Sequence, residues 1–142
     1  MPGYAPRKAA LGGVGKMNVE LRNLSTVSTA LTLSLDDQDA YLVWGGQSSA
    51  SRITLPYPEA GLFYQIFLNG PGVSTATKFL STANNLDGLS VDIITGGSTA
   101  KGAALASTVE AGASVQFLGL DSRRWLALRG PGSTVALGTA TS

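Results

Sequence analysis

Apolar and polar residues alternate along most of this sequence, and that alternation limits its possible folds more than any other feature. Because successive side chains of a β-strand point to opposite faces, a period of two is typical of half-buried strands. In residues 30–35, Leu31, Leu33 and Leu35 share one predicted face. No segment has an apolar stripe of helical period and length. The best helix candidate, residues 102–109, is too short to be stable alone.

Further runs with the same alternation supply the rest of the predicted core. They pair Ile53 with Leu55, Val91 with Ile93, Val115 with Phe117, and Trp125 with Ala127. The core is therefore expected to include Leu33, Ile53, Leu55, Val115, Phe117 and Trp125. Residues 40–44 and 62–68 are apolar on both faces, which predicts central strands or strands covered by a partner.

Turn-forming residues separate these runs at short intervals. Glycine, proline, asparagine and aspartate gather at residues 45–46, 69–72, 87–88, 96–97 and 130–132. Pro56 and Pro58 should end the strand before them, because proline has no amide proton to donate to the ladder. Roughly eight or nine short strands separated in this way predict an all-β protein: an antiparallel β-sandwich, a jelly roll or a small barrel.

The chain of 142 residues has the length of one domain. We expect a β domain over residues 18–142 and an extended N-terminal arm over residues 1–17. The beginning of the chain is basic, with Arg7, Lys8, Lys16 and Arg22 against Glu20 alone. Such a segment is either a frayed terminus or an arm that orders when it docks on an acidic neighbour.

The residue types needed for most catalytic and metal chemistry are missing. The chain has no histidine and no cysteine, so the commonest general base, thiolate nucleophile and transition-metal ligands are excluded. Asp36, Asp37 and Asp39 form the densest acidic cluster, but they lack the glycine and the terminal glutamate of a calcium loop. We predict no enzyme activity, no metal site and no cofactor.

Two short motifs resemble phosphate-binding or nucleic-acid-binding sites, but neither predicts such a site. Residues 12–16, Gly-Gly-Val-Gly-Lys, lack the first glycine and the Ser or Thr of a phosphate-binding loop. Arg123 and Arg124 precede Trp125, but a hairpin tip beside a strand explains them more simply than a stacking site for single strands. With a net charge of +1, we expect no nucleic-acid partner.

Low charge is the clearest sign of what the surface does. Charged residues make up 13% of the chain, about half the usual share for a soluble domain. A surface with so little charge does not keep copies of the chain apart, which suggests that neighbouring subunits normally cover part of it. No apolar window is long enough for a membrane helix and no signal peptide is evident, so we expect no membrane partner.

The order of the segments resembles a β-rich family of tailed-bacteriophage particles, the small capsid decoration (cement) proteins. The resemblance covers roughly residues 26–130 and rests on the order and spacing of short motifs. These motifs are residues 31–37, 40–44, Ile53-Thr54-Leu55-Pro56, 61–67, 85–88, 112–117 and 125–128. One departure is the turn before the final tryptophan, which is often glycine-rich in the family but is Asp121-Ser122-Arg123-Arg124 here.

The resemblance implies a structural protein on the outer surface of the virion. It would bind the major capsid protein, stabilise contacts between neighbouring capsid subunits, and assemble as a homotrimer, with a dimer as the next option. The candidate capsid contacts are Tyr4, Arg7, Lys8, Lys16 and Arg22. The alternative is a receptor- or carbohydrate-binding module of a phage head or tail fibre, in which Trp44 or Tyr57 would contact the sugar.

Overall fold

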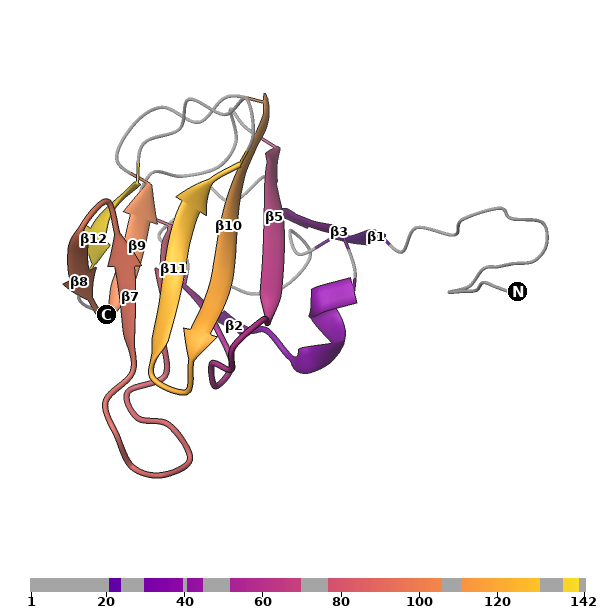
Figure 1. The fold of residues 1–142 in the computed structure, drawn as a ribbon. Coiled ribbons are helices and arrows are strands. Elements are labelled where there is room, and N and C mark those ends of the chain that lie inside the picture. The colour runs from indigo at the N-terminus through magenta and orange to yellow at the C-terminus, as the bar shows by residue number, and fades with distance from the viewer. Residues whose placement is uncertain are drawn as a thin grey trace.

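Strands make up 63% of the residues that the computed structural model describes, which are residues 21–23, 30–39, 41–44, 52–69, 77–105, 111–130 and 137–140 (Figure 1). They form two sheets. The first has the order β1 (Leu21–Asn23), β3 (Tyr41–Trp44), β5 (Phe63–Asn69), β10 (Ala111–Asp121), β11 (Arg124–Arg129), β7 (Asp92–Thr95) and β8 (Ser98–Ala100). The second has the order β12 (Leu137–Ala140), β9 (Gly102–Leu105), β6 (Lys78–Leu80), β4 (Arg52–Thr54) and β2 (Ala30–Thr32). The predicted all-β class is confirmed.

Both sheets are mixed rather than purely antiparallel. Along the first half of the chain, successive strands alternate between the two sheets: β1, β3 and β5 lie in one, and β2, β4 and β6 in the other. Neighbours within each of these sets are parallel. Parallel neighbours need a crossover connection, and here each crossover contains a strand of the facing sheet. The first half of the chain therefore winds around the core and passes from one sheet to the other with each successive strand.

The second half of the chain uses hairpins instead. β10 and β11 pair antiparallel across the turn at Ser122 and Arg123. β7 and β8 pair antiparallel across Gly96 and Gly97, which both have positive φ, as a two-residue turn of type I′ requires. β10 also pairs antiparallel with β5. The long β10 strand therefore joins the hairpin half of the chain to the coiled half.

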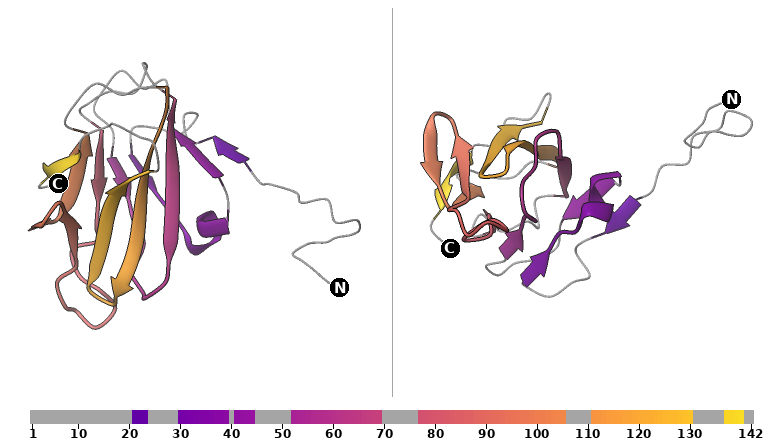
Figure 2. Two further views of the ribbon diagram at one scale, coloured as in Figure 1. Left: turned by 45° about the horizontal axis from the view of Figure 1, so that its top comes forward. Right: turned by 60° about the horizontal axis from the view of Figure 1, so that its bottom comes forward.

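The core fills the space between the two sheets (Figure 2). Its largest buried side chains are Trp44, Trp125, Tyr64, Phe79 and Phe117. The rings of Phe79 on β6 and Phe117 on β10 lie 5.2 Å apart between centroids, so they connect the two sheets directly. The six side chains expected in the core, Leu33, Ile53, Leu55, Val115, Phe117 and Trp125, are all buried.

One local prediction from the sequence is wrong. Leu35 does not share the buried face of Leu33: it is 56% exposed, because the strand ends at Thr32 and a 3₁₀ helix, η3 (Leu35–Asp39), follows. At the start of the helix, the Ser34 amide donates to the Asp37 carboxylate at 2.8 Å, and the Asp37 amide makes the first helical bond, to the Ser34 carbonyl at 3.1 Å. The weak helix candidate at residues 102–109, which is too short to be stable alone, is a strand where the structure describes it, since residues 102–105 form β9.

Candidate functional site

Four connecting segments meet at one end of the sandwich, the lower end in Figure 1. They are residues 33–39, 55–62, 81–91 and 119–124, and together with Phe63, the first residue of β5, they form the region that we call the loop end. The segments are joined by hydrogen bonds. The Tyr64 hydroxyl, at the start of β5, donates to the Ser34 carbonyl at 2.9 Å. The side-chain amide of Asn85 donates to the Ser122 carbonyl at 3.0 Å.

Gly119 makes possible the close contact between residues 55–62 and β10. Its amide donates to the Leu62 carbonyl at 2.7 Å, and its carbonyl accepts from the Gly61 amide at 2.9 Å. A Cβ atom at this position would lie 2.0 Å from the Glu59 carbonyl oxygen. Only glycine therefore lets the segment at residues 55–62 lie against β10.

The loop end carries most of the exposed large apolar side chains in the part of the chain that the structure describes. Of seven large apolar side chains that are exposed there, five lie at this end. They are Leu35, Tyr57, Phe63, Leu86 and Leu89. Several large apolar side chains exposed on neighbouring segments are more typical of a protein-binding surface than scattered ones are.

The loop at residues 81–91 is held in one conformation by Asn85. The Asn85 side-chain oxygen accepts from the amides of Asp87 and Leu89, both at 2.9 Å. The backbone adds two further bonds, from the Asn85 amide to the Leu89 carbonyl at 2.7 Å and from the Gly88 amide to the Asn85 carbonyl at 3.0 Å. Asn85 is itself buried. The tip of the loop is therefore ordered although its leucines face solvent.

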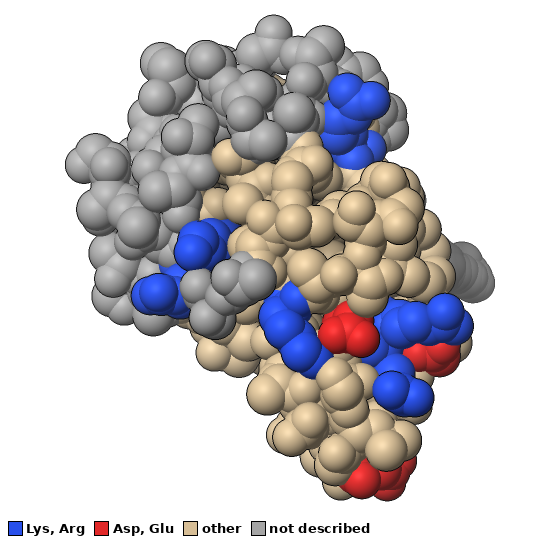
Figure 3. All heavy atoms as spheres, turned by 90° about the vertical axis from the view of Figure 1, so that its left-hand side faces the viewer, with Lys and Arg blue, Asp and Glu red and all other residues tan. Residues whose placement is uncertain are grey.

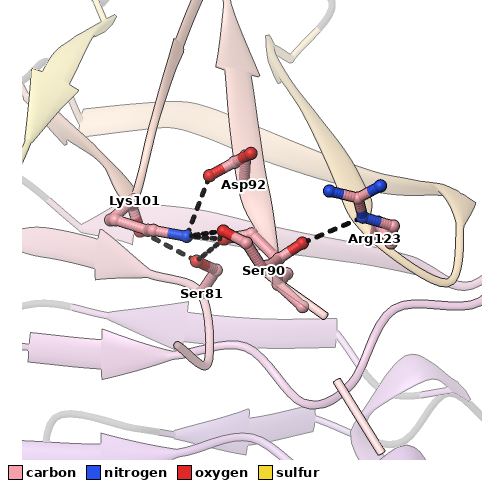
Figure 4. A network of polar contacts seen from close by, with 6 residues as sticks. Ser81, Ser90, Asp92, Lys101 and Arg123 are labelled. Carbon is pink, nitrogen blue, oxygen red and sulfur yellow. Dashed lines mark hydrogen bonds and ion pairs between the residues drawn. The ribbon is translucent and has the colours of Figure 1, made fainter. Parts of the chain in front are cut away.

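A polar network around Lys101 fixes the base of the same loop (Figure 4). The Lys101 ammonium donates to the Ser90 hydroxyl, to the Val91 carbonyl at 2.8 Å and to the Asp92 carboxylate at 3.0 Å. All three of its protons are thus engaged. Nearby, the Ser81 hydroxyl lies 3.1 Å from the carbonyls of both Val91 and Lys101.

This network does not resemble a serine–lysine catalytic pair, although it brings a serine and a lysine together. Such a pair needs an uncharged lysine to take the hydroxyl proton. Here the ammonium donates its protons to Ser90 and to the carboxylate of Asp92. The geometry therefore indicates that Lys101 fastens the loop to β7.

Two ion pairs, Arg124 with Asp121 and Lys101 with Asp92, lie at or beside the loop end in the described part of the chain. Figure 3 shows basic and acidic side chains intermixed on this side of the molecule. Arg124 contacts Asp121 at 2.7 Å, and the hydrogen bond from its guanidinium holds the pKa of the Asp121 carboxyl below its usual range. Arg123 donates to the Ser90 carbonyl at 3.3 Å. The four segments nevertheless contain six acidic residues and two arginines, so the loop end has a net negative charge.

Tyr64 makes the contact between β5 and η3 sensitive to high pH. Burial, and to a lesser extent the negative charge of Asp37, raise the pKa of its hydroxyl to about 12. In the unfolded chain the value is about 10, so the folded state holds the proton more tightly. The stability that this gives is complete below pH ~10 and is lost as pH rises from there toward ~12.

We expect Tyr64→Phe to lower stability by about 1 kcal/mol near neutral pH, since the Ser34 carbonyl loses its donor. The variant should also lose less stability than the unchanged chain above pH ~10. Urea unfolding at several pH values measures both effects. Tyr57→Phe, at an exposed ring, is the control. An equal alkaline loss with and without the Tyr64 hydroxyl would contradict the assignment.

A second exposed surface lies on the outer face of the seven-stranded sheet. The rings of Tyr41 on β3 and Phe67 on β5 lie 5.8 Å apart between centroids. Next to them, Gln65 on β5 lies opposite Gln116 on β10. Gln116 in turn lies opposite Leu128 on β11. This face combines aromatic rings with side-chain amides and has no charged residue among these five.

Most of the residues predicted to contact a capsid lie outside the described residues. Tyr4, Arg7, Lys8 and Lys16 are among these, as is the arm as a whole. The backbone of Arg22 lies in β1, opposite Leu42 of β3. No metal-binding group of three or more acidic residues is found within the described ranges. Asp37, from the predicted acidic cluster, is buried and accepts hydrogen bonds from Ser34.

The sequence analysis missed the leucines of the loop end. Leu86 and Leu89 flank the Asp87-Gly88 turn, and Gly88 has a φ of 77°. A turn of this kind places its neighbours at the surface, so leucines on both sides of it were the available signal. Of the two aromatic residues considered for sugar binding, Tyr57 is exposed, but Trp44 is fully buried and cannot contact a ligand at the surface.

Comparisons with known proteins add no family assignment. A scan against protein-family models found no match, and a search of curated proteins found no similar sequence. Within the described part of the chain, no helix is long and apolar enough to cross a bilayer.

Proposed function

We propose that this chain is a structural protein of the virion surface, a decoration protein that binds the outside of a phage head. The observation that supports this best is the loop end, where five large apolar side chains are exposed on an ordered framework. The low charge of the chain and the resemblance of its segment order to decoration proteins point the same way. Such a protein acts by burying surface and not by chemistry.

The mechanism follows from repetition on a symmetric shell. Each copy buries a limited area against the major capsid protein, and a copy that contacts two capsid subunits opposes their separation. A self-associated assembly binds through several copies at once, so that weak individual contacts add up to firm attachment. We propose a homotrimer as the assembled form, with a dimer as the next option.

The direct test mixes the purified chain with empty heads assembled from the major capsid protein encoded in the same genome. We expect the chain to sediment with the heads at a fixed ratio of copies, and to raise the temperature at which the heads break open. Light scattering on the free protein measures its oligomeric state. A chain that stays in the supernatant at micromolar excess would refute the proposal.

The outer sheet face supports a second candidate, a carbohydrate- or receptor-binding module. Tyr41 is exposed and contacts Phe67, while Gln65 on β5 and Gln116 on β10 lie opposite each other beside them. Aromatic rings offer apolar faces to sugar rings, and side-chain amides can both donate to and accept from hydroxyl groups. On this proposal the sugar lies across β3, β5 and β10.

Glycan-array binding distinguishes the two candidates. The second predicts binding of the unchanged chain, and at least a tenfold loss in Tyr41→Ala. Leu35→Ala is the control because it removes an exposed apolar side chain from the loop end instead of the sheet face. Absence of binding to any glycan, together with firm binding to heads, would favour decoration.

A further inference from the structure

Leu86 is the most exposed large apolar side chain in the described structure, at 82%, and Leu89 beside it is 47% exposed. A single exposed leucine is ordinary on a protein surface, but two on the same ordered loop form an apolar patch. Both leucines lie on the loop that projects beyond the strands at the lower end of Figure 1. Their exposure therefore needs an explanation beyond chance.

The backbone under these leucines is unusually well fixed for a projecting loop. Asn85 bonds to the amides of Asp87 and Leu89 and to the carbonyl of Ser122 on the neighbouring hairpin. Farther along the loop, the Val91 amide donates to the Ala83 carbonyl at 3.2 Å. A loop that is already ordered loses little conformational freedom on binding. Leu86 and Leu89 are therefore presented ready to bind.

The charges around Leu86 and Leu89 indicate the kind of partner surface that would bind these leucines. Asp87 lies between them and is the only charged residue of residues 81–91. It makes no ion pair with any residue that the structure describes. The lower projection in Figure 3 is accordingly almost uncharged, with an acidic group at its tip. A complementary surface is apolar and has a positive charge at its rim.

We propose that Leu86 and Leu89 enter an apolar pocket on the partner protein, and that a lysine or arginine at the rim of this pocket pairs with Asp87. This inference rests on the proposed function and makes it specific, because it assigns the principal shell contact to the loop at residues 81–91. Exposed apolar anchors that fill a pocket typically dominate the affinity of an interface, while their surroundings only exclude water.

A lipid surface fits these residues less well than a protein pocket does. If both leucines entered the hydrocarbon of a bilayer, the Asp87 carboxylate between them would be drawn toward a medium that cannot solvate it. Anionic headgroups would repel the same carboxylate. A protein pocket can supply the matching cation in a fixed position.

The test measures binding of the full chain and its variants to the same empty heads. We expect Leu86→Ser combined with Leu89→Ser to weaken binding by at least about 30-fold, the loss typical of removing a binding hot spot. Asp87→Lys should also weaken it, by about tenfold, because it would place like charges opposite each other. The matched control is Leu128→Ser, which removes an exposed leucine from the outer sheet face. Thermal unfolding confirms that each variant folds.

A photo-crosslinking residue at position 86 provides an independent readout, with position 128 as its control. The inference predicts a crosslink to the major capsid protein from position 86 only. If the unchanged chain binds heads but the double variant binds equally well, the inference is wrong and the proposed function stands. If the unchanged chain does not bind heads, both fail. Leucine-dependent binding to vesicles of phosphatidylcholine and phosphatidylserine, without binding to heads, would also overturn the inference.

Discussion

Gly119→Ala should destabilise the protein by about 3 kcal/mol or more, at the upper end of what overpacking usually costs. The new Cβ would lie 2.0 Å from the Glu59 carbonyl oxygen, and that neighbour is backbone, which cannot turn aside like a flexible side chain. Relief requires the segment at residues 55–62 to move away from β10. That movement would break the hydrogen bonds that Gly119 makes with Gly61 and Leu62.

Chemical unfolding of the variant measures this effect, and Gly112→Ala on the same strand is the control. Gly112 has a φ of 87°, but a Cβ there would meet nothing within 4 Å. Its replacement should cost only the backbone strain, about 1–2 kcal/mol. If Gly119→Ala is no more destabilising than Gly112→Ala, the close approach at Glu59 does not hold the loop end together.

Trp125→Ala should cost about 3–5 kcal/mol, the range found when a large aromatic side chain is removed from a core. Trp125 is fully buried, and its ring lies against Tyr64 with centroids 5.8 Å apart. Its indole nitrogen, however, has no hydrogen-bond partner among the residues that the structure describes. Trp125→Phe removes this unsatisfied donor and keeps most of the apolar volume, so it should destabilise the fold much less than alanine does.

Urea unfolding of both variants, beside Leu128→Ala, measures these differences. Leu128 lies on the same strand but is exposed, and its truncation should change stability by no more than about 0.5 kcal/mol. A small loss in Trp125→Ala would mean that the core between the sheets does not depend on the indole ring. A loss in Trp125→Phe as large as that in Trp125→Ala would show that the indole nitrogen has a partner after all.

Side-chain alternation predicted the buried face of several strands, although it did not identify Phe79 as a core residue and placed Leu35 there wrongly. Val115 and Phe117 are buried because they share one face of β10, and Val91 and Ile93 are buried for the same reason near β7. The period of a strand depends only on its own backbone geometry, so it can be recognised without knowing the neighbouring strand. The glycine pair at residues 96–97 predicted its turn equally well.

Strand pairing could not be predicted in the same way, because it depends on partners that are distant in sequence. Nothing in residues 52–54 shows that they pair in parallel with both β2 and β6. Leu35 continues the alternation of the strand before it, yet the hydrogen bonds between Ser34 and Asp37 turn the chain into η3. The exposed leucines at positions 86 and 89 were missed because alternation identifies buried faces and gives no information about loops.

The coiled first half of the chain has a consequence for how the protein is made. None of β1 to β6 pairs with the strand that directly follows it in sequence. β5 needs β10 as its neighbour, and β6 needs β9. A ribosome therefore releases β5 and β6 before β10 and β9 exist to pair with them, and pairing over such sequence distances is slow. Until β10 has emerged, we expect the nascent chain to remain unfolded and to depend on chaperones to avoid aggregation.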